Sequence, residues 1–150
     1  MIERIKYYGQ LLKFRLSASV VFSAIAGYLL GFEKFSVNEF IFLILGGFFV
    51  TGSANGFNQI LERNYDKLMA RTCSRPLPMG NLFINQALLF SILLGLLGLF
   101  FLNFINPEGS YFNFLSKSSF FGLLSIMLYV LVYTPMKRIS TTSVFIGAIA

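Results

Sequence analysis

The chain has 150 residues, of which 56% are hydrophobic and only 12% are charged, with a net charge of +6. Soluble domains carry about 25% charged residues, so this composition excludes an ordinary soluble domain and indicates a protein embedded in a lipid bilayer. The sequence has one cysteine and no histidine, which excludes an intrachain disulfide and any histidine-based catalysis or metal binding within these residues.

The apolar residues come in long blocks, and a helix needs about 20 mostly apolar residues to cross a membrane. Four blocks meet this requirement, at residues 16–32, 40–60, 84–105 and 118–134. They predict an all-α, polytopic transmembrane helix bundle. A fifth block begins near Ser143 and continues to Ala150. We therefore expect residues 1–150 to form a single membrane-embedded domain that is incomplete and truncated within its fifth helix.

The basic residues alternate strictly from loop to loop. Ten lie before the first block, between the second and third, or between the fourth and fifth: Arg4, Lys6, Lys13, Arg15, Arg63, Lys67, Arg71, Arg75, Lys137 and Arg138. Only Lys34 and Lys117 lie in the other two loops. By the positive-inside rule, we expect the N-terminus and the basic loops on the cytoplasmic side of the cell (inner) membrane. Since the positive charge follows the topology, we expect no nucleic-acid partner.

Small residues crowd the inner end of the second block. Gly52 and Gly56, at four-residue spacing, allow another helix to approach closely and are common at helix interfaces in lipid. This pattern predicts a tightly packed central helix, which leads directly into the carboxylates that follow.

Asn58, Glu62 and Asp66 lie four residues apart. On a helix each such step advances about 40° and rises about 6 Å, so their oxygens share one face. Magnesium prefers oxygen ligands, often one or two carboxylates plus substrate phosphates, and Arg71 and Arg75 follow as candidate phosphate ligands. Neighbouring Glu–Arg and Asp–Lys pairs would equally suit a solvated helix beside the membrane, and the spacing alone leaves both interpretations open.

The segment from Asn58 to Gly80 reads Asn-x-x-x-Glu-x-x-x-Asp-x-x-Met-x-Arg-Thr-x-x-Arg-Pro-Leu-Pro-x-Gly. It resembles the first aspartate-rich motif of the UbiA-type intramembrane prenyltransferases. Within that superfamily it most resembles the protohaem IX farnesyltransferases (haem O synthases), because Gln59 follows Asn58 and Glu62 occupies the middle position. Residues 133–138, Tyr-Thr-Pro-Met-Lys-Arg, resemble the segment after the fourth span of the same enzymes.

The resemblance implies a farnesyl diphosphate:protohaem IX transferase of haem O and haem A biosynthesis, with Mg²⁺ as its cofactor. It implies that Asn58, Glu62 and Asp66 are the catalytic metal ligands. It also implies diphosphate or substrate contacts for the following residues: Arg71, Arg75, Tyr133, Lys137 and Arg138. A haem-modifying enzyme would be a downstream partner. The family has about nine helices and a second aspartate-rich motif beyond this region, so we expect residues 1–150 alone to be inactive.

Two alternatives remain. A related UbiA-type enzyme could prenylate an aromatic quinone precursor, or the chain could be a non-enzymatic helical membrane carrier or subunit. One departure from the family pattern lies near the N-terminus, where Lys13-Phe14-Arg15 stands in place of the common Lys-Pro-Arg, and this leaves the role of the two basic residues open.

Overall fold

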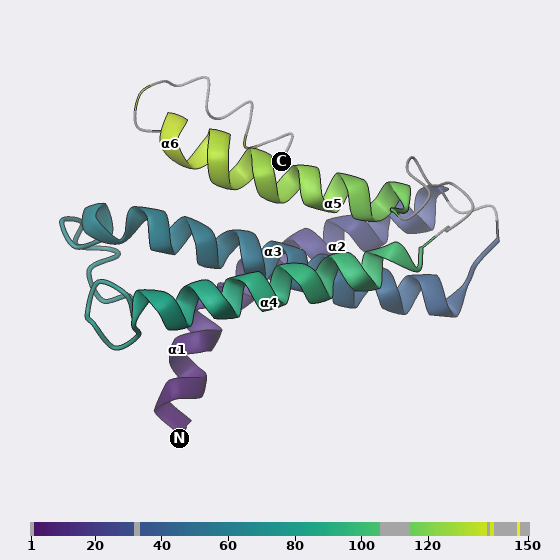
Figure 1. The fold of residues 1–150 in the computed structure, drawn as a ribbon. Coiled ribbons are helices and arrows are strands. Elements are labelled where there is room, and N and C mark those ends of the chain that lie inside the picture. Colours follow the sequence, from purple (N-terminus) through teal and green to yellow (C-terminus); the bar gives the residue numbers. More distant parts are fainter. Residues whose placement is uncertain (1, 32–33, 106–114, 138, 140–146, 148–150) are drawn as a thin grey trace.

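A computed structural model describes residues 2–31, 34–105, 115–137, 139 and 147. Its elements are helical throughout these residues (Figure 1). In chain order they are α1 (Ile2–Leu12), α2 (Phe14–Gly31), α3 (Val37–Asp66), α4 (Ile84–Asn103), α5 (Lys117–Met127), the π-helix η2 (Leu128–Tyr133) and α6 (Thr134–Met136).

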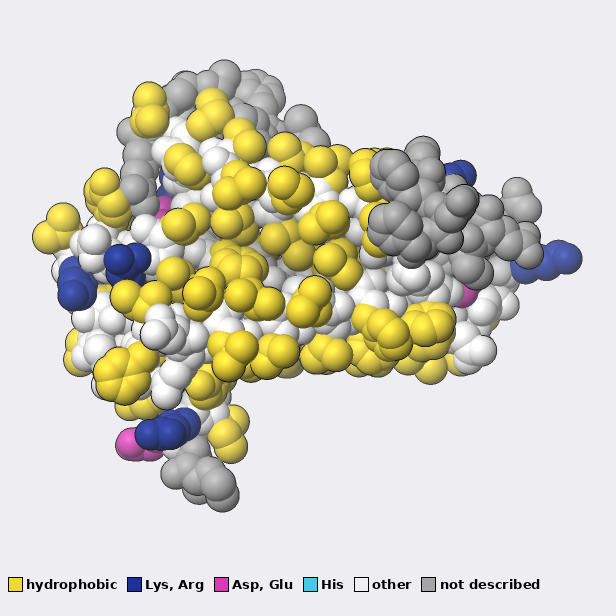
Figure 2. All heavy atoms as spheres, in the orientation of Figure 1, with side chains coloured by type: hydrophobic (Ala, Val, Ile, Leu, Met, Phe, Trp, Pro, Cys, Tyr) yellow, Lys and Arg dark blue, Asp and Glu magenta, His cyan; other side chains and the backbone are white. Residues whose placement is uncertain are grey.

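Four helical segments are long and apolar enough to cross a membrane, as predicted: Phe14–Gly31, Val37–Asp66, Ile84–Asn103 and Lys117–Met136. Apolar side chains cover most of the described surface on the face of the bundle shown in Figure 2, which fits a surface that faces lipid. The chain is therefore an integral membrane protein. The predicted fifth span falls almost entirely outside the described residues, and so does Arg138.

Serine caps set the starts of two spans. The Oγ of Ser36 accepts a hydrogen bond from the backbone N–H of Glu39 at the start of α3, and Ser116 does the same for the N–H of Ser119 at the start of α5. Each cap satisfies a backbone donor that would otherwise lack a partner in the first turn. From its cap, α3 runs unbroken to Asp66, so the predicted carboxylate stripe is the last part of a spanning helix and not a separate helix beside the membrane.

The central helix α3 packs closely against α4, and the prediction of small-residue packing is confirmed. A Cβ on Gly56 would overlap the Ser91 hydroxyl, and a Cβ on Gly98 would lie 2.7 Å from the backbone nitrogen of Val50. The close approach allows Ser53 Oγ to donate a 2.8 Å hydrogen bond to the carbonyl of Ser91. Polar side chains of this kind link helices where lipid offers no other partner.

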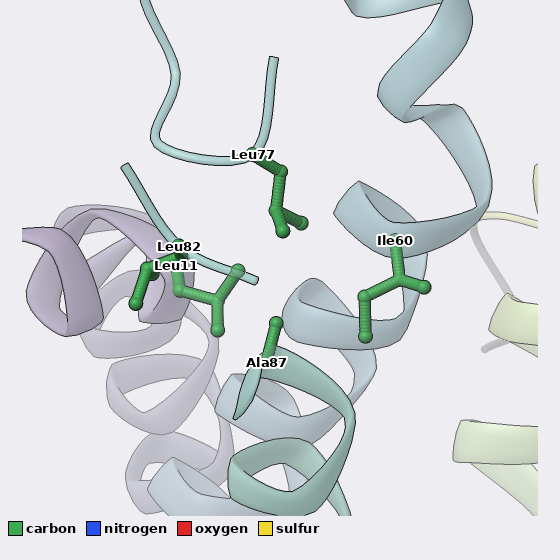
Figure 3. Close-up of a cluster of buried hydrophobic side chains, with 5 residues drawn as sticks. All are labelled: Leu11, Ile60, Leu77, Leu82 and Ala87. Carbon is green, nitrogen blue, oxygen red and sulfur yellow. The ribbon is translucent and has the colours of Figure 1, made fainter. Parts of the chain in front are cut away.

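A buried apolar cluster joins α1, α3, α4 and the connection between α3 and α4. Figure 3 shows its members: Leu11, Ile60, Leu77, Leu82 and Ala87. Leu77 and Leu82 are only 6% and 4% exposed, so burial holds the connection of residues 67–83 against the ends of three helices. This connection carries Arg71 and Arg75.

Candidate functional site

The polar stripe of α3 lies buried at one end of the bundle. Asn58, Glu62 and Asp66 are 2%, 5% and 4% exposed. All three side chains line a single cavity of about 490 Å³. Two buried carboxylates are costly in a membrane protein unless they are paired or hydrogen-bonded, and each of them has a cation from another part of the chain.

Glu62 pairs with Lys137, which follows α6. The Nζ of Lys137 lies 2.5 Å from Oε1 and 2.6 Å from Oε2 of Glu62, so one ammonium contacts both carboxylate oxygens. The same ammonium lies 5.8 Å from the centre of the Tyr133 ring. The pair joins residues 75 positions apart in the sequence, and it ties the end of the fourth span to α3.

Asp66 pairs with Arg75. An Nη1–Oδ2 distance of 2.7 Å joins them, and the Arg75 side chain keeps 25% of its surface exposed while Asp66 keeps 5%. The connection after α3 turns back at once, because Thr72 Oγ1 donates to the carbonyl of Asp66 at 3.1 Å and the Arg75 N–H donates to the carbonyl of Thr72 at 3.1 Å. These bonds, together with the buried leucines that follow, bring Arg75 to the cavity.

Asn58 is held from two sides. Its Nδ2 donates to Thr134 Oγ1 at 3.1 Å, and its Oδ1 accepts from the Nζ of Lys13 at 3.4 Å. Lys13 lies just before the first span. Burial, assisted by the nearby positive charges of Arg75 and Lys137, lowers the pKa of Lys13 to about 8. The same three positive charges favour an added anion at this position.

The cavity has an excess of positive charge. Its lining residues come from four separate parts of the chain: Lys13, Asn58, Glu62, Tyr65, Asp66, Met69, Arg71, Thr72, Arg75, Tyr129, Tyr133 and Lys137. Four of them are basic and two are acidic. Such a lining suits an anion that brings a hard cation with it, because carboxylates and cations are both within reach.

The stripe also fits the donor chemistry of magnesium. Its two carboxylates and one amide oxygen are hard ligands, and Mg²⁺ is usually held by one or two carboxylates together with substrate phosphates. Within the described part of the chain, no group of three or more His, Cys, Asp or Glu side chains could form a cage made by the protein alone.

A second cavity of about 350 Å³ lies beside the first and shares Tyr129 and Tyr133 with it. Most of its other lining side chains are apolar or small, and they come from α2, α3 and α5. The two tyrosines stack with ring centres 4.9 Å apart, and both belong to the π-helix η2. Short π-helical turns inside α-helices frequently mark functional sites.

Most of the predicted site residues lie together. Seven of the eight line the first cavity: Asn58, Glu62, Asp66, Arg71, Arg75, Tyr133 and Lys137. The eighth, Arg138, lies outside the described residues. Sequence analysis did not single out Tyr129, although its four-residue spacing from Tyr133 could have suggested it, and it left the role of Lys13 open.

The sequence of the chain is similar to those of known proteins. Residues 20–150 match the UbiA prenyltransferase family. The chain is 40% identical to the protoheme IX farnesyltransferase of Flavobacterium psychrophilum and 42% identical to that of Christiangramia forsetii, over 94% of this chain in each case. It is 37% identical to the mitochondrial protoheme IX farnesyltransferase of Saccharomyces cerevisiae, over 95% of this chain. These matches cover 45%, 44% and 29% of the respective relatives, so the chain spans less than half of their length. No solved structure matches it.

Proposed function

The chain belongs to the UbiA prenyltransferase family, and we propose that it forms the N-terminal, magnesium-diphosphate half of a protohaem IX farnesyltransferase. Such an enzyme transfers the farnesyl group of farnesyl diphosphate to a vinyl side chain of protohaem IX, and it releases diphosphate and gives haem O. The observation that carries the proposal is the 490 Å³ cavity, in which two buried carboxylates and four basic residues meet.

In this proposal, Asn58, Glu62 and Asp66 hold Mg²⁺, and the basic residues hold the diphosphate. A bound Mg²⁺ would supply Lewis-acid neutralisation of the leaving diphosphate. Arg75 and Lys137 already lie within 2.7 Å of the carboxylates. Small movements of these two side chains would therefore bring them to the oxygens of a diphosphate bound to the same Mg²⁺. Arginine suits phosphate oxygens especially well, because its planar fork can donate two parallel hydrogen bonds.

The residues of the chain assist bond cleavage by stabilising the leaving group. The allylic C–O bond breaks, its electron pair leaves with the diphosphate, and the π electrons of the vinyl group form the new C–C bond. This leaves a positive charge on the vinyl carbon attached to the ring, and the charge is removed when a water molecule adds there and releases a proton. Cationic side chains placed where this negative charge develops lower the barrier. The apolar second cavity, which meets the ionic one at Tyr129 and Tyr133, would take the farnesyl chain and keep water from the farnesyl cation until the C–C bond has formed.

We propose that the ionic cavity opens toward the cytoplasmic side of the inner membrane. The cavity lies at the end of the bundle that carries most of the basic residues, among them Lys13, Arg75 and Lys137, whereas Lys34 and Lys117 lie at the starts of α3 and α5. The positive-inside rule then assigns the basic end to the cytoplasm. Farnesyl diphosphate would present its charged end to this cavity and its apolar chain to the membrane interior.

The test is expression of the full-length protein in a bacterial host that lacks its own haem O synthase, followed by extraction of the haems. Haem O should accumulate with the wild type and not with Asp66→Asn. Prenylated quinone precursors in place of haem O would assign the chain to a related prenyltransferase instead. If the purified, membrane-inserted protein released no diphosphate from farnesyl diphosphate in the presence of Mg²⁺ and protohaem, the chain would be a non-enzymatic membrane protein.

A further inference from the structure

We propose that Lys13, at the bend between α1 and α2, is a further diphosphate-binding residue, and that amide side chains of α3 hold it in position. The inference deepens the proposed function and rests on it. Nothing in the sequence motif of the α3 stripe points to Lys13, because it lies 45 residues before Asn58. Its assignment comes from three observations: its backbone conformation, the hydrogen bonds that fix the bend, and its place in the cavity.

The backbone of Lys13 is strained. Its φ of 49° is the only positive φ of a non-glycine residue in the described parts of the chain. L-residues other than Asn and Asp rarely adopt this left-handed conformation, because the Cβ comes too close to the backbone. Here it separates two right-handed helices and turns α1 away from α2 (Figure 1). Strain of this kind persists where the surroundings over-determine it, and it is concentrated at functional sites.

Several hydrogen bonds from neighbouring side chains fix the conformation of this bend. The last carbonyls of α1 have no partner within the helix, and side chains of α2 and α3 supply partners instead. Asn55 Nδ2 donates to the carbonyl of Leu12 at 3.3 Å, and Ser17 Oγ donates to the same carbonyl at 2.8 Å. Gln59 Nε2 donates to the two preceding carbonyls of α1 at 3.1 and 2.9 Å. Since Asn55 and Gln59 are buried, these bonds are not exchanged for bonds to water.

The bend delivers the Lys13 ammonium into the cavity. Its Nζ donates to Asn58 Oδ1 at 3.4 Å, and its side chain lines the same cavity as Arg75 and Lys137. The amides that fix the bend flank Asn58 on α3. The helix that carries the proposed metal ligands thus also sets the position of the Lys13 ammonium, which joins Arg75 and Lys137 at the cavity. The metal and this ammonium would face the same diphosphate.

The test compares Lys13→Ala, Lys13→Arg and a matched control, Arg15→Ala, in the full-length protein. Arg15 is exposed and does not line the cavity, so its replacement removes the same charge from the same segment. With Lys13→Ala we expect KM for farnesyl diphosphate to rise about tenfold or more, since hydrogen bonds to charged groups are the strong ones. KM for protohaem should stay the same, Lys13→Arg should recover much of the loss, and Arg15→Ala should behave as the wild type.

The variant Lys13→Gly distinguishes the effect of losing the Lys13 charge from the effect of changing the backbone conformation at this position. Glycine adopts a positive φ without strain, so this variant should be at least as thermostable as the wild type and yet show the same rise in KM. Gln59→Leu, which removes the Nε2 donor shared by the carbonyls of Gln10 and Leu11, should also raise KM for farnesyl diphosphate and leave KM for protohaem unchanged. Wild-type KM for farnesyl diphosphate in both Lys13→Ala and Lys13→Gly would overturn the inference and leave the proposed function standing.

A binding measurement keeps the test independent of the acceptor. Calorimetric titration of the detergent-purified full-length protein with pyrophosphate and Mg²⁺ should show about tenfold weaker binding for Lys13→Ala than for Arg15→Ala. If the wild type binds magnesium pyrophosphate but makes no haem O, the proposed function fails in its acceptor and the inference on Lys13 is still decided. Equal affinity for Lys13→Ala and Arg15→Ala would refute the role of Lys13.

Discussion

The variant Glu62→Gln tests whether the Glu62 carboxylate binds a metal or serves only as one half of a structural ion pair. The change removes one charge and keeps the shape of the side chain. Two unit charges 4 Å apart interact by about 4 kcal/mol at an effective dielectric constant of 20, and each ~1.4 kcal/mol of lost stabilisation is tenfold in rate. We therefore expect turnover to fall by about a thousandfold or more. The fold should survive, because the Lys137 side chain is 33% exposed and can return to water at a cost of about 1 kcal/mol or less.

The assay is diphosphate release from farnesyl diphosphate by the full-length protein at saturating Mg²⁺, with thermal unfolding measured in parallel. The double variant Glu62→Lys/Lys137→Glu serves as the control, because it keeps an ion pair and moves the carboxylate off α3. It should fold and remain inactive. Near-wild-type turnover of Glu62→Gln, or an active double variant, would refute the metal assignment and leave Glu62 as one half of a structural pair.

Two further predictions concern the phosphate side and the packing. Arg75→Ala should raise KM for farnesyl diphosphate about tenfold while KM for the acceptor stays the same, because the guanidinium is placed to bind phosphate oxygens. Arg63 lies outside the cavity, so Arg63→Ala is the control. An unchanged KM for farnesyl diphosphate in Arg75→Ala would contradict the assignment. Gly98→Ala should destabilise the protein by about 1–3 kcal/mol through overpacking, because its Cβ would meet the backbone of α3 at 2.7 Å. Gly9→Ala, with no atom within 4 Å of the new Cβ, should not lower the melting temperature, and an equal loss in both variants would refute the packing argument.

The spans and the stripe could be predicted because both depend on local patterns. About 20 apolar residues in a row have few alternatives to a spanning helix. The ends of the predicted blocks agree with the observed spans to within three residues, except that α3 continues six residues further, to Asp66. Residues at four-residue steps share a face on any helix, so the burial of Asn58, Glu62 and Asp66 along one cavity follows from α3 being continuous.

The partners of the stripe could not be predicted, because they depend on where distant segments meet. No local pattern pairs Glu62 with Lys137 or Asp66 with Arg75. Nearest-neighbour spacing suggested Arg63 and Lys67 instead, and Arg63 in fact donates to a backbone carbonyl of α3. The bend at Lys13 was missed for a related reason. A left-handed residue without glycine or proline gives no sequence signal, since its conformation is imposed by hydrogen bonds from α3.

The two ion pairs lead to a last prediction, that magnesium and diphosphate bind cooperatively. Among the described residues, each of the two buried carboxylates is paired with a cation, and separating such a pair costs free energy because the buried charge is less well compensated. Arg75 and Lys137 can leave the carboxylates to a metal only if phosphate oxygens become their new partners. They can turn to phosphate only if a metal takes their place beside the carboxylates. If magnesium or diphosphate binds alone, it must therefore break an ion pair and leave one member of that pair without a new partner.

Such coupling is reciprocal and typically amounts to 1–3 kcal/mol, or about 5- to 150-fold in affinity. Calorimetric titration of the full-length protein with pyrophosphate should thus give at least about tenfold tighter binding with Mg²⁺ than with a chelator. Because Mg²⁺ also associates with pyrophosphate in solution, Asp66→Asn is the necessary comparison. Solution chemistry is the same for both proteins, so a Mg²⁺ effect that is equally large in Asp66→Asn would show that the carboxylate of Asp66 takes no part in the exchange.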